Sequence, residues 1–222
     1  MKKLALALVA VLTAGLLAAC GSSFDASGYI QALLDNSYKN DSAAFVEMKI
    51  GTAEEAAALY EEGLNAELDG MLDNMDLPEE QLEEFRAIIA EILGKAKYTV
   101  GEAEKQSDGS YVVTVTYEQL NVFVPAMQSY YTVIEQLVTG WTEAALAGEA
   151  TPTEDEMMTQ MIGELKVCLE DAIANATYDE PATTTITIEL IDKVYTPKEA
   201  DLLNLETVMF DVEELQGLEA AF

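Results

Sequence analysis

The sequence predicts an α+β fold in which amphipathic helices pack on a small antiparallel sheet of three or four strands. Several segments repeat apolar residues every three or four positions, as helices with one buried face do. Two further segments alternate apolar and polar residues on either side of a turn sequence, which is typical of paired strands. Half of the 222 residues are hydrophobic, so the chain has the apolar surface that a core requires.

The N-terminus has the pattern of a membrane-targeting segment. Lys2 and Lys3 precede an apolar run, residues 4–16, that is too short for a normal membrane span. The run ends in Leu17-Ala18-Ala19-Cys20, which resembles the bacterial lipobox, where cleavage precedes a cysteine that carries a diacylglycerol. We therefore expect a signal peptide over 1–19, and a lipidated Cys20 with a short tether over 20–23. An ordinary secretory peptide with an incidental cysteine is the alternative.

The net charge limits the partners of the mature chain. Removing Lys2 and Lys3 from the 11 basic residues leaves nine against 41 acidic residues, a net charge of −32. This charge repels phosphate backbones and anionic lipid headgroups, so we expect no nucleic-acid partner and membrane attachment through the lipid only.

The cysteine and histidine content excludes several kinds of catalysis. The chain has no histidine, and Cys168 is the one cysteine besides Cys20. Cys/His zinc sites, Ser-His-Asp triads and Cys-His pairs therefore cannot form. Cys168 lies at helical spacing from Ile162, Leu165 and Ala172, which predicts a small core residue rather than a reactive thiol.

The first helices are predicted over 25–37 and 53–75, and a third begins at Pro78 and ends near Gly94. Three Thr-x-x-Glu sequences predict capping boxes at helix starts, at Thr52, Thr153 and Thr196. Strands are predicted over 98–104 and 111–119, joined by a turn at Ser107-Asp108-Gly109.

A similar order of elements follows in the second half, with helices after Pro125 and Pro152 and a strand over 183–191. The mature chain is thus predicted to be a single acidic α+β domain over 24–222. Half-repeats over 52–123 and 124–195 are one interpretation of this order. A chance alternation of helices and hairpins is the other.

Three short segments carry a resemblance to a known family. They are Asp25-Ala26-Ser27-Gly28-Tyr29, the stretch TAEEAAALYEEG over 52–63, and Lys97-Tyr98-Thr99-Val100. These resemble an acidic lipoprotein family of Gram-positive gut bacteria, a domain of unknown function. The resemblance implies an α+β domain on the outer face of a cytoplasmic membrane, and it supplies no active-site residues.

Acidic residues gather at one expected helix-loop-helix corner. They are Asp69, Asp73, Asp76, Glu79 and Glu80. This corner is the best candidate for weak divalent-cation binding, although it lacks the alternating pattern of a calcium loop. A solvated helix end with an acidic first turn is the simpler interpretation, because the helix dipole favours it.

The expected helix after Pro125 carries Tyr130, Tyr131 and Trp141, the weak candidates for a ligand groove. A buried core stripe is the simpler interpretation, except that Tyr130 and Tyr131 cannot both face fully inward.

The function best supported by the sequence is a membrane-anchored, extracytoplasmic lipoprotein that acts as a non-catalytic binding module, with an envelope protein or wall polymer as its partner. No catalytic residue, metal or cofactor is expected beyond the lipid on Cys20. A cation-modulated surface protein is one alternative. A glycan hydrolase that uses two carboxylates is a less favoured one.

Overall fold

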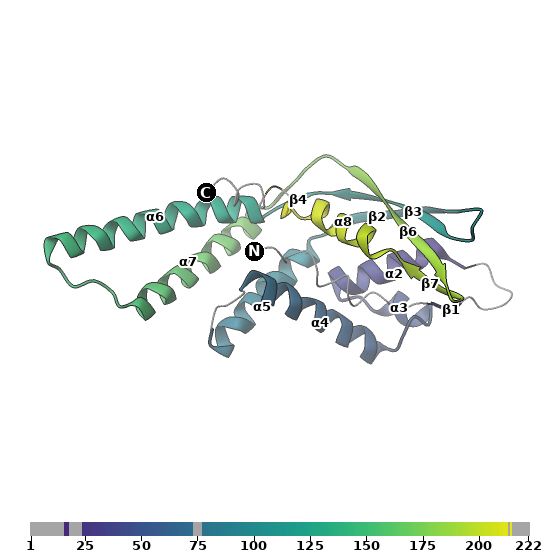
Figure 1. Ribbon diagram of the computed structural model, residues 1–222, viewed down its shortest axis with the longest axis horizontal. Coiled ribbons are helices and arrows are strands. Elements are labelled where there is room, and N and C mark those ends of the chain that lie inside the picture. Colours follow the sequence, from purple (N-terminus) through teal and green to yellow (C-terminus); the bar gives the residue numbers. More distant parts are fainter. Residues whose placement is uncertain (1–15, 18–23, 73–76, 213, 215–222) are drawn as a thin grey trace. The chain divides into compact units, whose positions relative to one another are not determined.

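The computed structural model describes residues 16–17, 24–72, 77–212 and 214, and its contacts divide the chain into two compact units (Figure 1). The first, here called the sheet unit, comprises Met1–Leu120 and Tyr178–Phe210. The second, here called the hairpin unit, comprises Asn121–Thr177 and Asp211–Phe222. The single domain over 24–222 stays a prediction.

The sheet unit contains five of the described helices. They are α2 (Ala26–Lys39), α3 (Ala43–Glu47), α4 (Ala53–Met71), α5 (Glu79–Gly94) and α8 (Glu199–Met209). The predicted capping box at Thr52 is present, since the Thr52 hydroxyl accepts from Glu55 N and the Glu55 carboxylate accepts from Thr52 N. It satisfies two backbone donors that the first helical turn leaves without an intrahelical partner.

The sheet is antiparallel, with the order β7-β6-β3-β2. Its strands are β2 (Lys97–Lys105), β3 (Tyr111–Glu118), β6 (Ala182–Ile191) and β7 (Val194–Pro197), and a two-residue strand β1 (Leu16–Leu17) pairs with β7. The predicted α+β fold class is therefore confirmed. Because β1 lies inside the predicted signal peptide, the mature protein is expected to keep β7 as an edge strand.

One face of the sheet is apolar and the other is rich in threonine. Val113, Val115, Ile186 and Ile188 are completely buried, on the face that the helices cover in Figure 1. Their sequence neighbours point to the opposite face because side chains alternate along a strand. That second face includes the cross-strand pairs Thr114–Thr185 and Thr116–Thr183.

Two tight turns, one between β2 and β3 and one between β6 and β7, lie at the same end of the strands. The β2–β3 turn contains Gly109 with a φ of 91°, a left-handed conformation that glycine adopts without strain. The β6–β7 loop consists of Asp192 and Lys193, whose φ values are 50° and 70°. Two consecutive left-handed residues form the tight hairpin turn that suits the twist of paired strands.

Phe24 is the first residue described after Cys20, and it packs against the sheet. Its ring stacks on Tyr195 of β7 at 3.9 Å between centroids, and it contacts Tyr111 of β3 at 5.5 Å. Tyr29 of α2 lies 5.4 Å from the same ring. These contacts fix the point at which the N-terminal segment joins the sheet.

The hairpin unit is built from α6 (Phe123–Ala147) and α7 (Glu154–Ala174). The predicted capping box at Thr153 is present, with Glu156 as its second residue. Gly148 ends α6 in a left-handed conformation with a φ of 72°. Short strands β4 (Leu120–Asn121) and β5 (Thr177–Tyr178) pair with each other where the chain enters and leaves this unit.

A distant aspartate supplies the missing cap of α6. Val122 precedes the helix and offers no side-chain acceptor. The Asp211 carboxylate accepts hydrogen bonds from Phe123 N at 3.0 Å and from Val124 N at 2.8 Å. It thereby performs the role of an N-cap residue from 88 positions along the chain.

The predicted capping box at Thr196 is wrong. Thr196 pairs with Glu189 inside the sheet, so the chain leaves β7 only at Pro197, and Lys198 becomes the N-cap of α8 without a side-chain hydrogen bond. The helix-helix-hairpin order does occur twice, as α4, α5, β2, β3 and as α6, α7, β6, β7. Duplication itself stays a prediction.

Candidate functional site

The lipobox cysteine Cys20 lies outside the described residues, and its lipidation stays a prediction. In the part of the chain that the structure describes, no helix is both long and apolar enough to cross a membrane.

The structure brings together only part of the predicted acidic corner. Asp69 is exposed near the end of α4, and Glu79 and Glu80 are exposed in the first turn of α5. Asp73 and Asp76 lie outside the described residues. Within the described ranges, no group of three acidic or cysteine side chains is arranged to hold a metal ion. These exposed residues fit the solvated helix end that the sequence also allowed.

The aromatic residues of α6 divide between two environments. Burial raises the pKa of Tyr130, and so does the charge of the nearby Cys168 on α7. Tyr130 therefore faces the partner helix. Tyr131 lines a groove along α6 instead, and Trp141 is half-buried. This arrangement is consistent with the sequence expectation that Tyr130 and Tyr131 cannot both face fully inward.

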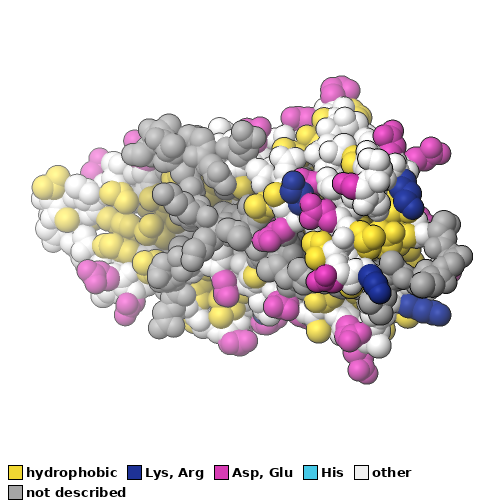
Figure 2. Space-filling view, turned by 45° about the vertical axis from the view of Figure 1, so that its right-hand side comes forward, with side chains coloured by type: hydrophobic (Ala, Val, Ile, Leu, Met, Phe, Trp, Pro, Cys, Tyr) yellow, Lys and Arg dark blue, Asp and Glu magenta, His cyan; other side chains and the backbone are white. Residues whose placement is uncertain are grey.

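An apolar groove runs along α6 in the hairpin unit. It has a volume of about 650 Å³, and its lining includes Gln128, Tyr131, Ile134, Glu135, Val138 and Thr139. Tyr131, Ile134 and Val138 follow one another at helical spacing, so they form a continuous stripe. Val138 is 47% exposed. Figure 2 shows hydrophobic side chains gathered over this hairpin at the left of the view.

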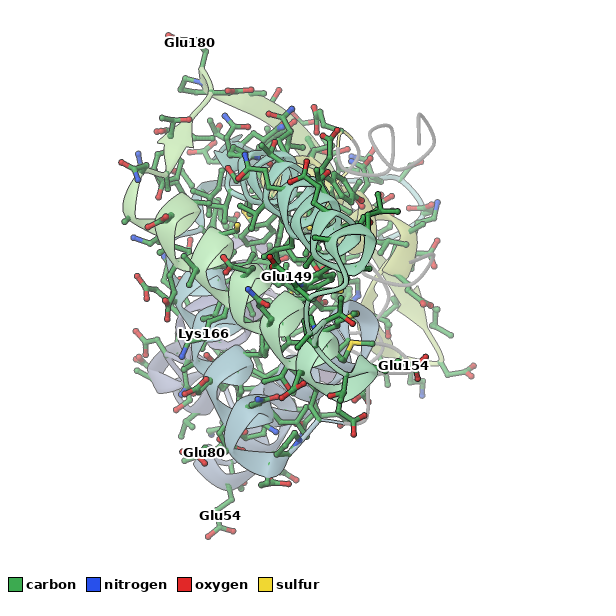
Figure 3. All side chains as sticks on the ribbon, turned by 90° about the vertical axis from the view of Figure 1, so that its left-hand side faces the viewer. Glu54, Glu80, Glu149, Glu154, Lys166 and Glu180 are labelled. Atoms are coloured by element: carbon green, nitrogen blue, oxygen red, sulfur yellow. The ribbon has the colours of Figure 1, made fainter. Side chains whose placement is uncertain are left out.

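The surroundings of this groove are strongly acidic. The stretch 121–177 contains nine acidic residues and one basic residue, Lys166. Glu135 lies on the groove itself, and Glu149 and Glu154 lie at the turn end of the hairpin (Figure 3). The apolar stripe thus lies beside Glu135, on a hairpin with nine acidic residues and one basic residue.

Sequence reasoning missed a buried pair of acids in the sheet unit. Glu67 of α4 is 8% exposed and Glu206 of α8 is 5% exposed, and their carboxyl groups hydrogen-bond to each other. Burial raises the pKa of both groups, and the charge of Glu206 raises that of Glu67 further. A signal was present, because Glu67 lies three residues after Leu64 and next to Leu68, and helical spacing places it near these buried apolar side chains.

A polar pocket at one end of the sheet was also missed. It has a volume of about 490 Å³, and its lining includes Lys39, Lys97, Tyr98, Thr116, Tyr117 and Glu118. Each lysine is neutralised by a carboxylate at 3.0 Å, Lys39 by Asp35 and Lys97 by Glu118. The same two lysines also cover the faces of aromatic rings: Lys39 lies over Tyr98, and Lys97 lies over Tyr178.

Asp35 organises the helix side of this pocket. Its carboxylate accepts hydrogen bonds from Gln31, Tyr98 and Lys39. Burial alone would raise the pKa of Asp35, but these hydrogen bonds and the lysine charge outweigh burial and lower it. Burial, with the bond to Asp35, raises the pKa of Tyr98. The cluster therefore carries fixed, paired charges at neutral pH.

The fold and these surfaces define an acidic α+β protein with an exposed apolar groove, and no catalytic constellation is apparent among the described side chains. No family model matches the sequence, and no curated protein is significantly similar to it.

One solved structure is similar in fold. It is the crystal structure of YcdA, a candidate lipoprotein from Bacillus subtilis subsp. subtilis str. 168, with a TM-score of 0.52 and 16% sequence identity. The match covers 83% of this chain and 55% of YcdA, so this chain spans about half the length of that protein. The likeness supports the α+β fold.

Proposed function

We propose that the protein is a lipid-anchored lipoprotein of the cell envelope that binds a protein partner through the groove along α6. The observation that carries the proposal is the apolar groove stripe of the half-buried Tyr131 and Ile134 and the exposed Val138, on a highly acidic helical hairpin. Exposed apolar surface rimmed by polar groups is a common mark of protein interaction sites.

Charge determines the kind of partner. A second copy of this chain, with its net charge of −30, would be repelled from the acidic hairpin. A segment with an apolar face and flanking lysines or arginines would instead gain from both features of the groove. The expected occupant is therefore a basic amphipathic helix of another protein, bound in the helix-in-groove mode.

The lipid anchor is supported by three points of different kinds. The first 20 residues have the charge, apolar length and lipobox of a lipoprotein signal. The fold resembles that of YcdA, itself described as a candidate lipoprotein. The first residue described after Cys20 is Phe24, four positions later, and its ring stacks on Tyr195. Two or more acyl chains on Cys20 would hold the protein firmly at a membrane surface.

The groove is tested with a defined probe. The chain from Ser22 onward is titrated with an 18-residue peptide of leucine and lysine that forms an amphipathic helix, and with a leucine-glutamate counterpart. We expect the lysine peptide to bind and the glutamate peptide not to bind. Val138→Asp should weaken binding by about tenfold, which is 1.4 kcal/mol.

The matched control is Leu146→Asp, the same kind of change at a position on α6 that is 84% exposed and outside the groove lining. This variant should bind the lysine peptide as the unmodified chain does. Equal weakening by the two substitutions would mean that the groove position has no special role in binding, and it would refute the groove as the binding site. Pull-down from envelope extracts then identifies the natural partner or shows a wall polymer in its place.

A further inference from the structure

The tip of the sheet where β6 turns into β7 carries exposed apolar residues. Leu190 is 42% exposed and Ile191 is 51% exposed, and both precede the tight turn at Asp192 and Lys193. Large apolar side chains at a solvent-exposed turn lose favourable burial unless another surface covers them.

The same tip is directly connected to the point where the tether enters the fold. Phe24 stacks on Tyr195, and Tyr195 is the cross-strand partner of Leu190. Only residues 21–23 lie between Phe24 and the lipid-bearing Cys20. A chain extends by at most about 3.6 Å per residue, so Phe24 can lie no more than about 15 Å from the Cα atom of Cys20.

The turns at this tip carry charges of both signs. Lys105 and Lys193 lie there with Asp108 and Asp192, and Glu104 and Glu189 lie close by in the same strands. The Lys105 ammonium lies 5.6 Å from the centre of the Tyr111 ring. Figure 2 shows Lys and Arg side chains toward the right of the view, over the sheet unit. This end of the sheet therefore presents lysines as well as acids to a membrane surface.

From these observations we propose that the β6–β7 tip rests on the membrane surface, with Leu190 and Ile191 in the headgroup region. The proposal builds on the lipid anchor proposed above. The anchor supplies a high local concentration of the tip at the bilayer, so two apolar side chains suffice for a contact that the free protein would not maintain. The sheet unit would thus be oriented on the membrane rather than freely suspended from it.

The test replaces the lipid with a defined anchor, so that it does not depend on lipidation in cells. A histidine tag takes the place of Cys20 and holds the mature chain on phosphatidylcholine vesicles that contain a nickel-chelating lipid. With Cys168→Ser as background, an environment-sensitive NBD fluorophore is attached at Ile191→Cys. We expect its emission to shift to the blue on the vesicles, and a spin-labelled lipid to quench it.

The control carries the same fluorophore at Glu180→Cys. Glu180 is exposed beside the opposite end of β6 and projects from the sheet unit (Figure 3), about 30 Å away along the strand. Its emission should not change. Absence of a shift at 191, or equal shifts at both positions, would overturn the proposed contact. Failure of lipidation in cells would refute the proposed anchor and leave this measurement unaffected.

A second measurement uses the affinity of the tagged chain for the same vesicles. Ile191→Asp should weaken this affinity by at least about fivefold, because the tip and the tag act as two linked contacts. Leu146→Asp, the same change on α6, should leave it unaltered. An unchanged affinity for Ile191→Asp would also overturn the proposal.

Discussion

Glu67 of α4 and Glu206 of α8 share a hydrogen bond between their carboxyl groups inside the sheet unit. One oxygen of each group, Glu67 Oε1 and Glu206 Oε2, has no hydrogen-bond partner. The buried ring of Tyr38 lies close to both acids, and their charges, together with burial, raise its pKa. Neither acid forms an ion pair with a lysine or arginine in the described part of the chain. The pair is therefore stable only while it retains a proton.

This pair predicts that the protein is more stable in mild acid than at neutral pH. The ordinary pKa of a glutamate is 4.5, and burial raises that of Glu206 to about 7 and that of Glu67 higher still. Between pH 4.5 and 7 the folded state therefore binds more protons than the unfolded state. Stability must fall as the pH rises through this window, and urea unfolding at intervals across it measures the fall.

Glu67→Gln removes one of the two titrating groups and leaves an amide that can donate to Glu206. The variant should unfold at a higher urea concentration than the unmodified protein at pH 7.5, and its stability should change less with pH. Glu62→Gln, an exposed change on the same helix, serves as the control. Parallel pH profiles for all three proteins would contradict the role assigned to the pair.

Asp211 is expected to stabilise the start of α6 from a distance. Asp211→Ala removes the acceptor for two backbone N–H groups and should lower the free energy of unfolding by about 1–3 kcal/mol. Asp211→Asn keeps one acceptor oxygen and should lower the free energy of unfolding by a smaller amount. Chemical denaturation followed by circular dichroism compares the two. Equal losses would indicate that the charge of Asp211, rather than its hydrogen bonds, stabilises the helix.

Cys168 is expected to react slowly with thiol reagents. It is buried on α7, and burial followed by the charges of Glu164 and Asp171 raises the pKa of its thiol. A chain that begins at Ser22 has no other cysteine, so labelling by DTNB reports on this position alone. Labelling should be complete in urea and much slower in buffer. Rapid labelling of the folded chain would show that the thiol is accessible.

Salt should stabilise the protein, because 41 acidic residues face only 11 basic ones. Raising the ionic strength from about 0.01 to 0.15 M shortens the range of charge repulsion from about 30 to 8 Å. The melting temperature should rise. If calcium raises it more than sodium does at equal ionic strength, the acidic corner that begins at Asp69 binds cations. Equal increases in melting temperature with calcium and with sodium would indicate that this corner is a solvated surface that binds no cation.

The sequence alone predicted those structural elements that depend on residues close together in the chain. Thr52 and Thr153 begin helices because the capping box involves residues only three positions apart. The alternation of Val113 and Val115 with threonine identified β3 and its buried face. The fold class followed from these periodic segments.

Features that depend on distant residues could not be predicted in the same way. Asp211 caps α6 from 88 positions away, and Thr196 was assigned to a helix although pairing with Glu189 places it in β7. The polar pocket joins Lys39 of α2 to the ends of β2 and β3, which no local pattern reveals. Of the predicted groove residues, Tyr131 is part of the groove lining, whereas Tyr130 faces α7.

Lipid attachment at Cys20 is tested most directly by expressing the full chain and its Cys20→Ala variant in a Gram-positive host with radiolabelled palmitate. The unmodified chain should carry the label, sediment with the membrane fraction and be cut at the cell surface by an added protease. Cys20→Ala should carry no label and appear outside the membrane fraction. Equal labelling, or equal sedimentation of the two proteins, would contradict the lipid anchor.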